Sequence, residues 1–222
     1  MKNNSYIWIS LIVLIFGIYA VPKIVNKFKD TGVVESDRLN VANKRELKVI
    51  AKAPEFSFTD QNNQTITNKD YEGKVYLVEF FFSSCPTICP IMNENMVKLQ
   101  NEFSKDSNFA IASITIDPNT DTPEHLKEHA ALIGAKMQNW HFLTGEQTAI
   151  FDLSKKFNLY VGQNDDAPGG FEHSGMFALI DKKGNIRSRK SEQFDYPIVY
   201  YDGIEEEGVK MLKEDIQQLL KE

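Results

Sequence analysis

The sequence predicts an α/β protein with one central mixed β-sheet flanked by helices. Two near-continuous apolar runs, Val75–Phe82 and Phe109–Ile116, have the length and the branched and aromatic content of strands buried on both faces. Segments in which apolar residues recur at helical spacing follow these runs. Because strands that alternate with helices build a sheet covered by helices, the pattern indicates this fold class.

Size and charge limit the possible functions. The chain has 222 residues and a formal net charge of −6. Residues 1–29 contain four lysines and no acid, which leaves a net charge of −10 on the remainder. An acidic domain of this kind is a poor nucleic-acid binder, so no nucleic-acid partner is expected. Two cysteines in the whole chain do not make a disulfide scaffold.

The N-terminal stretch predicts a transmembrane helix over residues 1–25. Tyr6–Val21 is apolar apart from one serine and one glycine, slightly short of the roughly 20 residues of a spanning helix. A signal peptide that ends at Ala20 is the alternative, disfavoured because Ile18 is bulky where a signal peptidase prefers a small residue. More lysines follow the apolar stretch than precede it, so flanking charge alone would place the next domain in the cytoplasm.

The rest of the chain predicts a linker over residues 26–52 and a folded domain over 53–222. The linker is polar, mixed in charge and without a sustained period. At the start of the domain, Phe56 and Phe58 alternate with polar residues as in a short strand. The buried strand Val75–Phe82 ends where two serines break the apolar run, and Pro90 suits the first turn of the helix that follows. The apolar face of that helix is expected to contain Cys89, Met92, Met96, Leu99 and Phe103.

The second half predicts further strands and helices in alternation. After Phe109–Ile116, a loop leads to Pro123, which suits a helix start. The remaining expected elements are a strand at Trp140–Leu143, a helix at Gln147–Phe157, an acidic loop at Asn164–Gly170, strands at Met176–Ile180 and around Ile186 joined by a turn, and a last helix through Val209, Leu212, Ile216 and Leu219. Three glutamates precede this last helix and suit its positive end.

The two cysteines stand together where a buried strand becomes a helix. Cys85 and Cys89 are four residues apart, and the unpaired N–H groups of a helix start stabilise a thiolate. A thiolate is both the nucleophile of disulfide exchange and a ligand for soft metals. The pair is therefore expected to form a disulfide or to bind one soft metal ion. Two buried, inert cysteines are the less favoured alternative.

Four blocks of residues, in this order, resemble the Sco/SenC family: Cys85-Pro-Thr-Ile-Cys89-Pro90, Asp117-Pro-Asn-Thr-Asp121-Thr-Pro123, Leu143-Thr-Gly145 and His173-Ser174. The resemblance covers about residues 53–221. It implies a thioredoxin-like fold tethered to a membrane, with the domain on the outer, periplasmic side of the inner membrane. This implication overrules the charge-based orientation. It also implies copper handling during assembly of the binuclear copper centre of cytochrome c oxidase, whose copper-bearing subunit would be the partner.

The resemblance implies Cys85, Cys89 and His173 as copper ligands. Two thiolates suit Cu(I), and an imidazole beside two sulfurs can also hold Cu(II). Considered alone, His173 would be interpreted as a surface histidine. The chain departs from the family pattern at Thr87, where members often have an aspartate between the cysteines. Because one anion is then missing beside the thiols, they are expected to ionise slightly more easily.

The same strand also resembles the thioredoxin strand that leads into redox cysteines. Glu79, six residues before Cys85, matches the buried acid of that family and is a possible proton acceptor. An exposed glutamate, or one hydrogen-bonded to a neighbour, explains Glu79 equally well. The sequence thus leaves open whether the chain is an enzyme, a thiol–disulfide oxidoreductase served by a thiol reductant, or a metallochaperone.

Other candidate ligands have simpler explanations. Met92 and Met96 could offer thioethers to copper, but they lie on the apolar helix stripe and are expected in the core. His125 and His129 are one helical turn apart and are expected on a solvated face. Asp117 and Asp121 could orient the site loop, although helix capping and turn formation explain them nearly as well.

Overall fold

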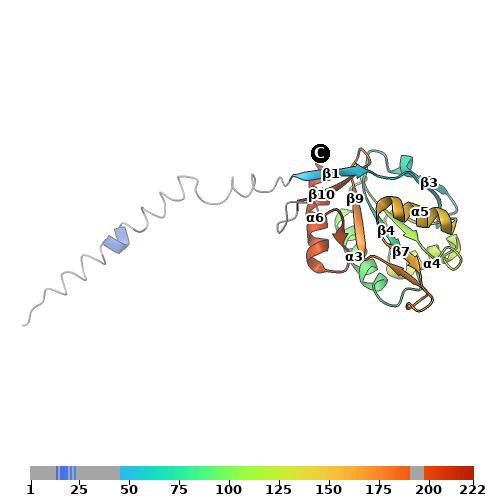
Figure 1. Ribbon diagram of the computed structural model, residues 1–222. Helices are drawn as coiled ribbons and strands as arrows, with labels where there is room; N and C mark the ends of the chain where they lie inside the picture. The colour runs from blue at the N-terminus through green and yellow to red at the C-terminus, as the bar shows by residue number, and fades with distance from the viewer. Residues whose placement is uncertain (1–13, 15, 20, 22, 24–45, 191–197) are drawn as a thin grey trace, which may run out of the picture. The chain divides into compact units, whose positions relative to one another are not determined.

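The structure is a computed structural model that describes residues 14, 16–19, 21, 23, 46–190 and 198–222 (Figure 1). The chain forms two units, Met1–Arg45 and Glu46–Glu222. In the first unit the described residues are helical. None of the helices in the described part of the chain has both the length and the apolar character needed to cross a membrane. The anchor expected over residues 1–25 falls mostly outside the described residues.

A mixed sheet forms the centre of the second unit, as predicted. Its strand order is β1-β10-β9-β4-β5-β6-β2-β3, and β11 pairs with β9. The central strands β4, β5 and β6 are parallel, and the strands outside them pair antiparallel. The bounds are β1 Leu47–Lys52, β2 Ser57–Asp60, β3 Thr65–Thr67, β4 Val75–Phe81, β5 Phe109–Thr115, β6 Trp140–Thr144, β9 Met176–Ile180, β10 Asn185–Arg189 and β11 Tyr201–Asp202. All residues of β4 and β5 are buried, which confirms the central position expected from their apolar runs.

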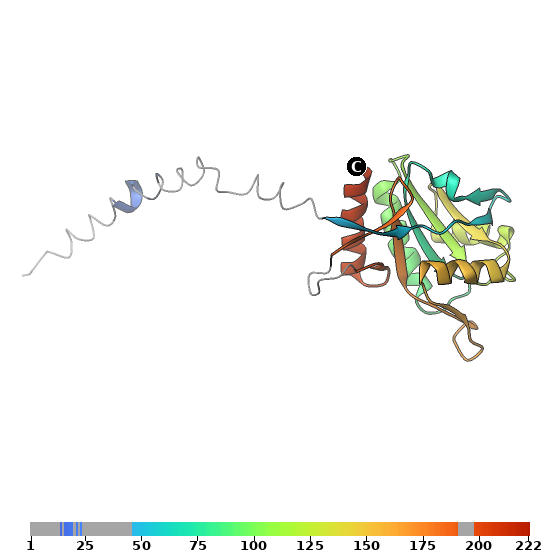
Figure 2. The same ribbon diagram turned by 45° about the horizontal axis from the view of Figure 1, so that its top comes forward.

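Helices flank this sheet. Their bounds are η1 Asn68–Tyr71, α3 Cys89–Phe103, α4 Pro123–Ile133, α5 Gln147–Phe157 and α6 Glu206–Leu220. Helices α3 and α6 lie side by side (Figure 2), where Lys213 and Glu102 form an ion pair of 3.0 Å. The expected apolar face of α3 is confirmed, because all five of its residues are buried.

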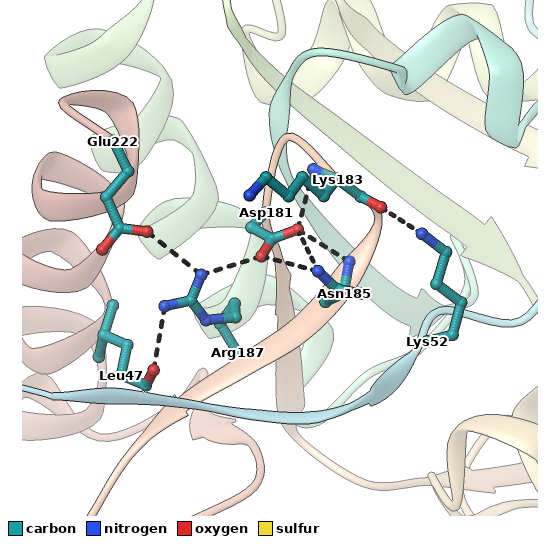
Figure 3. Close-up of polar contacts among 7 residues, drawn as sticks. All are labelled: Leu47, Lys52, Asp181, Lys183, Asn185, Arg187 and Glu222. Atoms are coloured by element: carbon teal, nitrogen blue, oxygen red, sulfur yellow. Dashed lines mark hydrogen bonds and ion pairs between the residues drawn. The ribbon is translucent and has the colours of Figure 1, made fainter.

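Strand β1 lies within residues 26–52, which the sequence predicts to be a linker, so the expected start of the domain at residue 53 is wrong. Leu47 is 6% exposed and belongs to the core, whereas Val49 is 60% exposed. Arg187 of β10 holds the start of β1, because its guanidinium donates to the Leu47 carbonyl oxygen at 3.0 Å and to Asp181 at 2.9 Å (Figure 3). An edge strand with few buried side chains leaves only a weak apolar pattern, which is why the sequence did not reveal it.

A separate hairpin projects from the body of the domain (Figure 2). It consists of β7 Val161–Gln163 and β8 Phe171–His173, which pair antiparallel. The expected loop at 164–170 joins them, and Gly169 and Gly170 turn the chain with φ values of +84° and +79°. Phe171 of the hairpin packs on Phe82, with ring centroids 5.6 Å apart. The hairpin thereby brings the end of β8 to the end of β4.

Candidate metal centre

The cysteine loop begins where β4 ends. The Cys85 N–H donates to the Phe82 carbonyl oxygen at 3.2 Å, and α3 starts at Cys89 with Pro90 in its first turn. A spacing of four residues would put both cysteines on one face of a helix, but only Cys89 belongs to α3, so the two do not share a helix face. Cys85 lies in the loop before the helix, since a residue that precedes a proline is disfavoured in helical geometry. The loop places the two sulfurs together instead.

Cys85, Cys89 and His173 form the group that the family resemblance implies. Their three possible ligand atoms all lie within 4.8 Å of one another. The Cys89 sulfur is 3.1 Å from Nε2 of His173. Both cysteines are free thiols, 7% and 2% exposed. Residues 84 positions apart in the chain thus meet because the β7–β8 hairpin folds back onto the end of β4.

The His173 ring is oriented to present Nε2 to the sulfurs. Its Nδ1 lies 3.2 Å from the carbonyl oxygen of Ser174. Because a carbonyl can only accept, Nδ1 donates to it, and this contact leaves Nε2 as the ring atom that can bind a metal. The ring also meets Phe82 edge to face, with centroids 5.8 Å apart. These two contacts fix the imidazole in the geometry that a ligand requires.

The two thiols have opposite acid strengths. The hydrogen bond from Cys89 lowers the pKa of Cys85 to about 3, with help from His173 and Thr87. The same hydrogen bond, together with burial, raises the pKa of Cys89. Because the two sulfurs titrate as a coupled pair, one negative charge is shared and sits mainly on Cys85. The Thr87 hydroxyl is 3.6 Å from the Cys85 sulfur, so a neutral group stands beside the thiolate.

Glu79 lies in the interior below this pair. Its side chain is completely buried, which rules out the exposed position considered from the sequence. The Ser113 hydroxyl donates to Oε1 at 2.6 Å, whereas Oε2 has no partner among the described residues. Burial raises the pKa of Glu79 to about 7 against the opposing effect of Ser113 and the His173 charge. A carboxyl with this pKa can exchange a proton near neutral pH.

Asp121 anchors the start of the cysteine loop. Its buried carboxylate accepts from the Ser83 N–H at 3.1 Å and from the hydroxyls of Ser83 and Thr115. His125 adds a contact of 3.0 Å between Nε2 and the Ser83 hydroxyl oxygen. The orienting role considered for Asp121 is supported by these contacts. Ser83 and Thr115 left no signal in the sequence, because their hydroxyls bond to Asp121 only once three separate segments of the chain meet.

The remaining sequence candidates lie in the core. Met92 and Met96 are fully buried, as expected for residues of the apolar stripe. His129 is only 9% exposed, so the solvated position expected for it is wrong. Its ring stacks on Phe81 with centroids 5.5 Å apart, and Asn93 lies 3.4 Å from its Nε2. An α4 face that packs on β4 and α3 explains this burial.

The donor set fits a soft metal ion. Two sulfurs and one imidazole nitrogen, already gathered within 4.8 Å, are the ligands that Cu(I) and thiolate-bound Cu(II) prefer. A chelate needs distances near 2.0–2.3 Å to each donor, which small side-chain shifts provide from this arrangement. Hard cations are a poor match, because the group offers no oxygen ligand.

Comparisons with known proteins point to one family. The family model described as SCO1/SenC matches residues 45–205. The SCO1 protein homolog of Bacillus subtilis is 30% identical over 133 residues, covering 59% of this chain and 69% of that protein. A relative from Stutzerimonas stutzeri, provisionally named a copper-binding protein, is 29% identical over 138 residues, covering 60% of this chain and 66% of that protein. The matched part thus spans about two thirds of these relatives.

One solved structure extends the comparison to the fold. BsSco is described as a member of the Sco family of cytochrome c oxidase assembly proteins that contains a disulfide switch. It superimposes with a TM-score of 0.65 at 26% identity, covering 80% of this chain and 97% of that one.

Proposed function

The chain belongs to the SCO1/SenC family, and from this premise we propose that it is a membrane-anchored copper metallochaperone for the assembly of cytochrome c oxidase. Copper is its cargo, held as one ion by Cys85, Cys89 and His173. The observation that carries the proposal is the convergence of these three ligand atoms within 4.8 Å at the end of a buried strand.

The geometry supports binding that is firm and yet reversible. The thiolate on Cys85 offers the cation one ionised ligand at once, and Cys89 releases its proton as the ion binds. His173 supplies the third donor from a hairpin that is separate from the main sheet. Three ligands leave the ion open to a further ligand, so an acceptor can bind it before the chaperone lets go. A purely structural ion, whose coordination is closed by protein ligands, has no need of this opening.

The partner and the location are parts of the same proposal. BsSco, 26% identical, is described as belonging to a family of cytochrome c oxidase assembly proteins. We propose that the acceptor is the copper-bearing subunit of the oxidase. We also propose that residues 1–25 form a single-pass anchor in the inner membrane, with the domain on the periplasmic side. Labelling of Cys85 by a membrane-impermeant thiol reagent in spheroplasts tests the orientation, and protection until lysis would refute it.

A copper titration of the reduced protein tests the binding site. We expect one equivalent of Cu(I) to bind tightly, and each of Cys85→Ser, Cys89→Ser and His173→Ala to weaken binding at least about tenfold, the usual effect of losing one ligand contact. His141→Asn is the matched control, because it removes an imidazole of β6 whose Nδ1 lies 2.9 Å from the Tyr71 hydroxyl and which belongs neither to the group nor to the contacts of the cysteine loop. Binding that persists unchanged in all three ligand variants would show that copper is held elsewhere.

A thiol–disulfide oxidoreductase is the second candidate. The lowered pKa of Cys85, the raised pKa of Cys89 and the buried Glu79 match the division of labour between an attacking and a resolving thiol. The same titration separates the two functions. The oxidoreductase is supported if His173→Ala binds copper as tightly as the wild-type protein, and if the protein rapidly turns over a protein disulfide in the presence of a thiol reductant.

A further inference from the structure

A groove of about 430 Å³ lies between α3 and α4, and both cysteines are among its lining residues. Its apolar walls are Pro90 and Val97 from α3 and Leu132 and Ile133 from α4. Leu132 is 85% exposed, more than any other large apolar side chain in the described part of the chain. Soluble surfaces do expose single leucines, but a leucine beside a groove that leads to reactive sulfurs suggests contact with a partner.

The groove approaches the sulfurs from a side that leaves His173 in place. None of its lining residues comes from the β7–β8 hairpin. The His173 ring of that hairpin contacts Phe82 and Cys89, and neither His173 nor Phe82 lines the groove. An incoming ligand can therefore reach Cys85 through the groove without displacing the histidine.

The charge of the groove restricts what can occupy it. Among the described residues, Glu94 is the one acid that lines the groove, and Lys98 already pairs with it at 2.9 Å. The described lining contains no lysine or arginine. His129 belongs to its lining but is packed on Phe81 and faces Asn93. Apolar walls without a free charge suit an uncharged segment with apolar side chains.

We propose that this groove is the docking site for an extended, uncharged segment of the acceptor protein, in which a cysteine stands between apolar residues. The proposal rests on the metallochaperone function and names the partner chemistry of the same site. The cysteine is fixed by chemistry, because only a soft donor competes for Cu(I) with two thiolates. Leu132 contacts an apolar side chain of the segment while the cysteine reaches the end of the groove.

The transfer step is a ligand exchange. The acceptor thiolate forms a bond to copper as the bond from copper to the Cys85 sulfur breaks, and the oxidation state of copper does not change. The departing Cys85 thiolate balances the charge, and the proton released by the acceptor thiol goes to solvent or to the chaperone pair. The groove contributes by holding the acceptor sulfur near the ion.

A metal-free reaction tests the groove independently of copper. The probe is a heptapeptide with one cysteine flanked by alanine and leucine, activated as a mixed disulfide with thionitrobenzoate. Cys85 thiolate attacks the peptide sulfur, the Cys85–peptide disulfide forms, and the coloured thionitrobenzoate leaves. The activated disulfide of N-acetylcysteine, which cannot use the walls of the groove, gives the reference rate.

Leu132→Lys is expected to slow the peptide reaction about tenfold, equivalent to about 1.4 kcal/mol, and to leave the N-acetylcysteine reaction unchanged. Val49→Lys is the matched control, since Val49 is a comparably exposed apolar residue on β1. Replacing the leucines of the peptide by lysine should abolish the preference of the wild-type protein for the peptide over N-acetylcysteine.

Equal slowing of both probes, or no slowing, would overturn the docking proposal while leaving copper binding intact. Conversely, a failed copper titration with a retained peptide preference would remove the metallochaperone function and keep the groove. The size of the reduced protein in solution is the last check. A wild-type dimer that Leu132→Lys converts to a monomer would show that a second copy of this chain occupies the groove, which also overturns the proposal.

Discussion

Cys85 and Cys89 owe their different acidities mainly to the hydrogen bond that they share. That bond stabilises a thiolate on Cys85 and keeps the proton on Cys89, which is also the more deeply buried sulfur. The residue types and the spacing of the pair were visible in the sequence, so thiol chemistry could be predicted. The third member was not visible in the same way. His173 gains its role from a three-residue strand and a contact with Ser174, and only the family resemblance singled it out.

Glu79 couples the stability of the fold to pH. Its pKa is raised from 4.5 to about 7, so the native state holds a proton that the unfolded state has already released between these values. The contribution of Glu79 to the free energy of unfolding is therefore fully present below about pH 4.5. It falls as the pH rises towards 7, by up to about 3 kcal/mol. In Glu79→Gln the side chain no longer titrates, and this loss should disappear. Urea unfolding of both proteins at pH 5 and pH 8 measures the difference.

The same variant tests the chemical role of Glu79. The negative charge of Glu79 contributes to the raised pKa of Cys89. Without this charge, alkylation of Cys89 should begin at lower pH than in the wild-type protein. Ser113→Ala is a useful control, because it removes the hydroxyl that donates to Glu79 and keeps the carboxyl. An alkylation profile identical to wild type would exclude Glu79 as a proton acceptor for the thiols, whatever its effect on stability.

Among the elements, those with long apolar runs could be predicted and those with short ones could not. Strands β4 and β5 and helices α3 and α5 lie where the sequence placed them, because burial on both faces or along one stripe leaves a clear pattern. Strands β7, β8 and β11 have two or three residues each, and pairing rather than side-chain burial defines them. The hairpin that carries His173 consists of two of these strands, so one of the three ligands of the metal centre comes from an element that leaves little trace in the sequence.

The loop between β4 and α3 depends on Asp121 for its shape. Asn at this position would turn an amide N–H₂ towards one of the donors that the carboxylate now accepts. We expect Asp121→Asn to lower the free energy of unfolding by about 1–3 kcal/mol, the range for a broken buried hydrogen-bond pair. Local opening should exceed this global effect, because Ser83 loses its anchor. Amide hydrogen exchange of Ser83 and Cys85 measures the local part.

A control variant and a contrary outcome belong to the Asp121→Asn experiment. Asp165→Asn, which changes an exposed acid in the hairpin loop, should leave both the stability and the exchange rates as they are. If Ser83 and Cys85 exchange no faster in Asp121→Asn than the global destabilisation requires, Asp121 stabilises the fold without positioning the cysteine loop.

At the scale of the whole molecule, the main polar clamp joins the two ends of the domain. Arg187 contacts the first residue of β1 through the Leu47 carbonyl and the last residue of the chain through Glu222 at 3.2 Å (Figure 3). Asp181 holds Arg187 in place and also closes the turn between β9 and β10. The start of the domain is therefore determined by tertiary contacts of Arg187 and not by a local sequence pattern. The sequence around residues 46–52 carries no comparable sign, and the predicted boundary was therefore placed too late.

This clamp predicts where the chain can be shortened. A chain that starts at residue 46 keeps β1, its pairing with β10 from Leu47 to Lys52, and the acceptor of Arg187. A chain that starts at residue 53 loses the buried Leu47 side chain and exposes the edge of β10 and the Arg187 guanidinium. Burial of one leucine and one charge-assisted hydrogen bond together amount to about 3–5 kcal/mol, a large share of the stability of a domain this size.

We therefore expect the shorter chain to unfold at much lower urea concentration than the chain from residue 46. The exposed β10 edge should also make it prone to aggregate. Equal urea midpoints for the two chains would show that β1 adds no stability to the sheet, and that the domain is complete from residue 53.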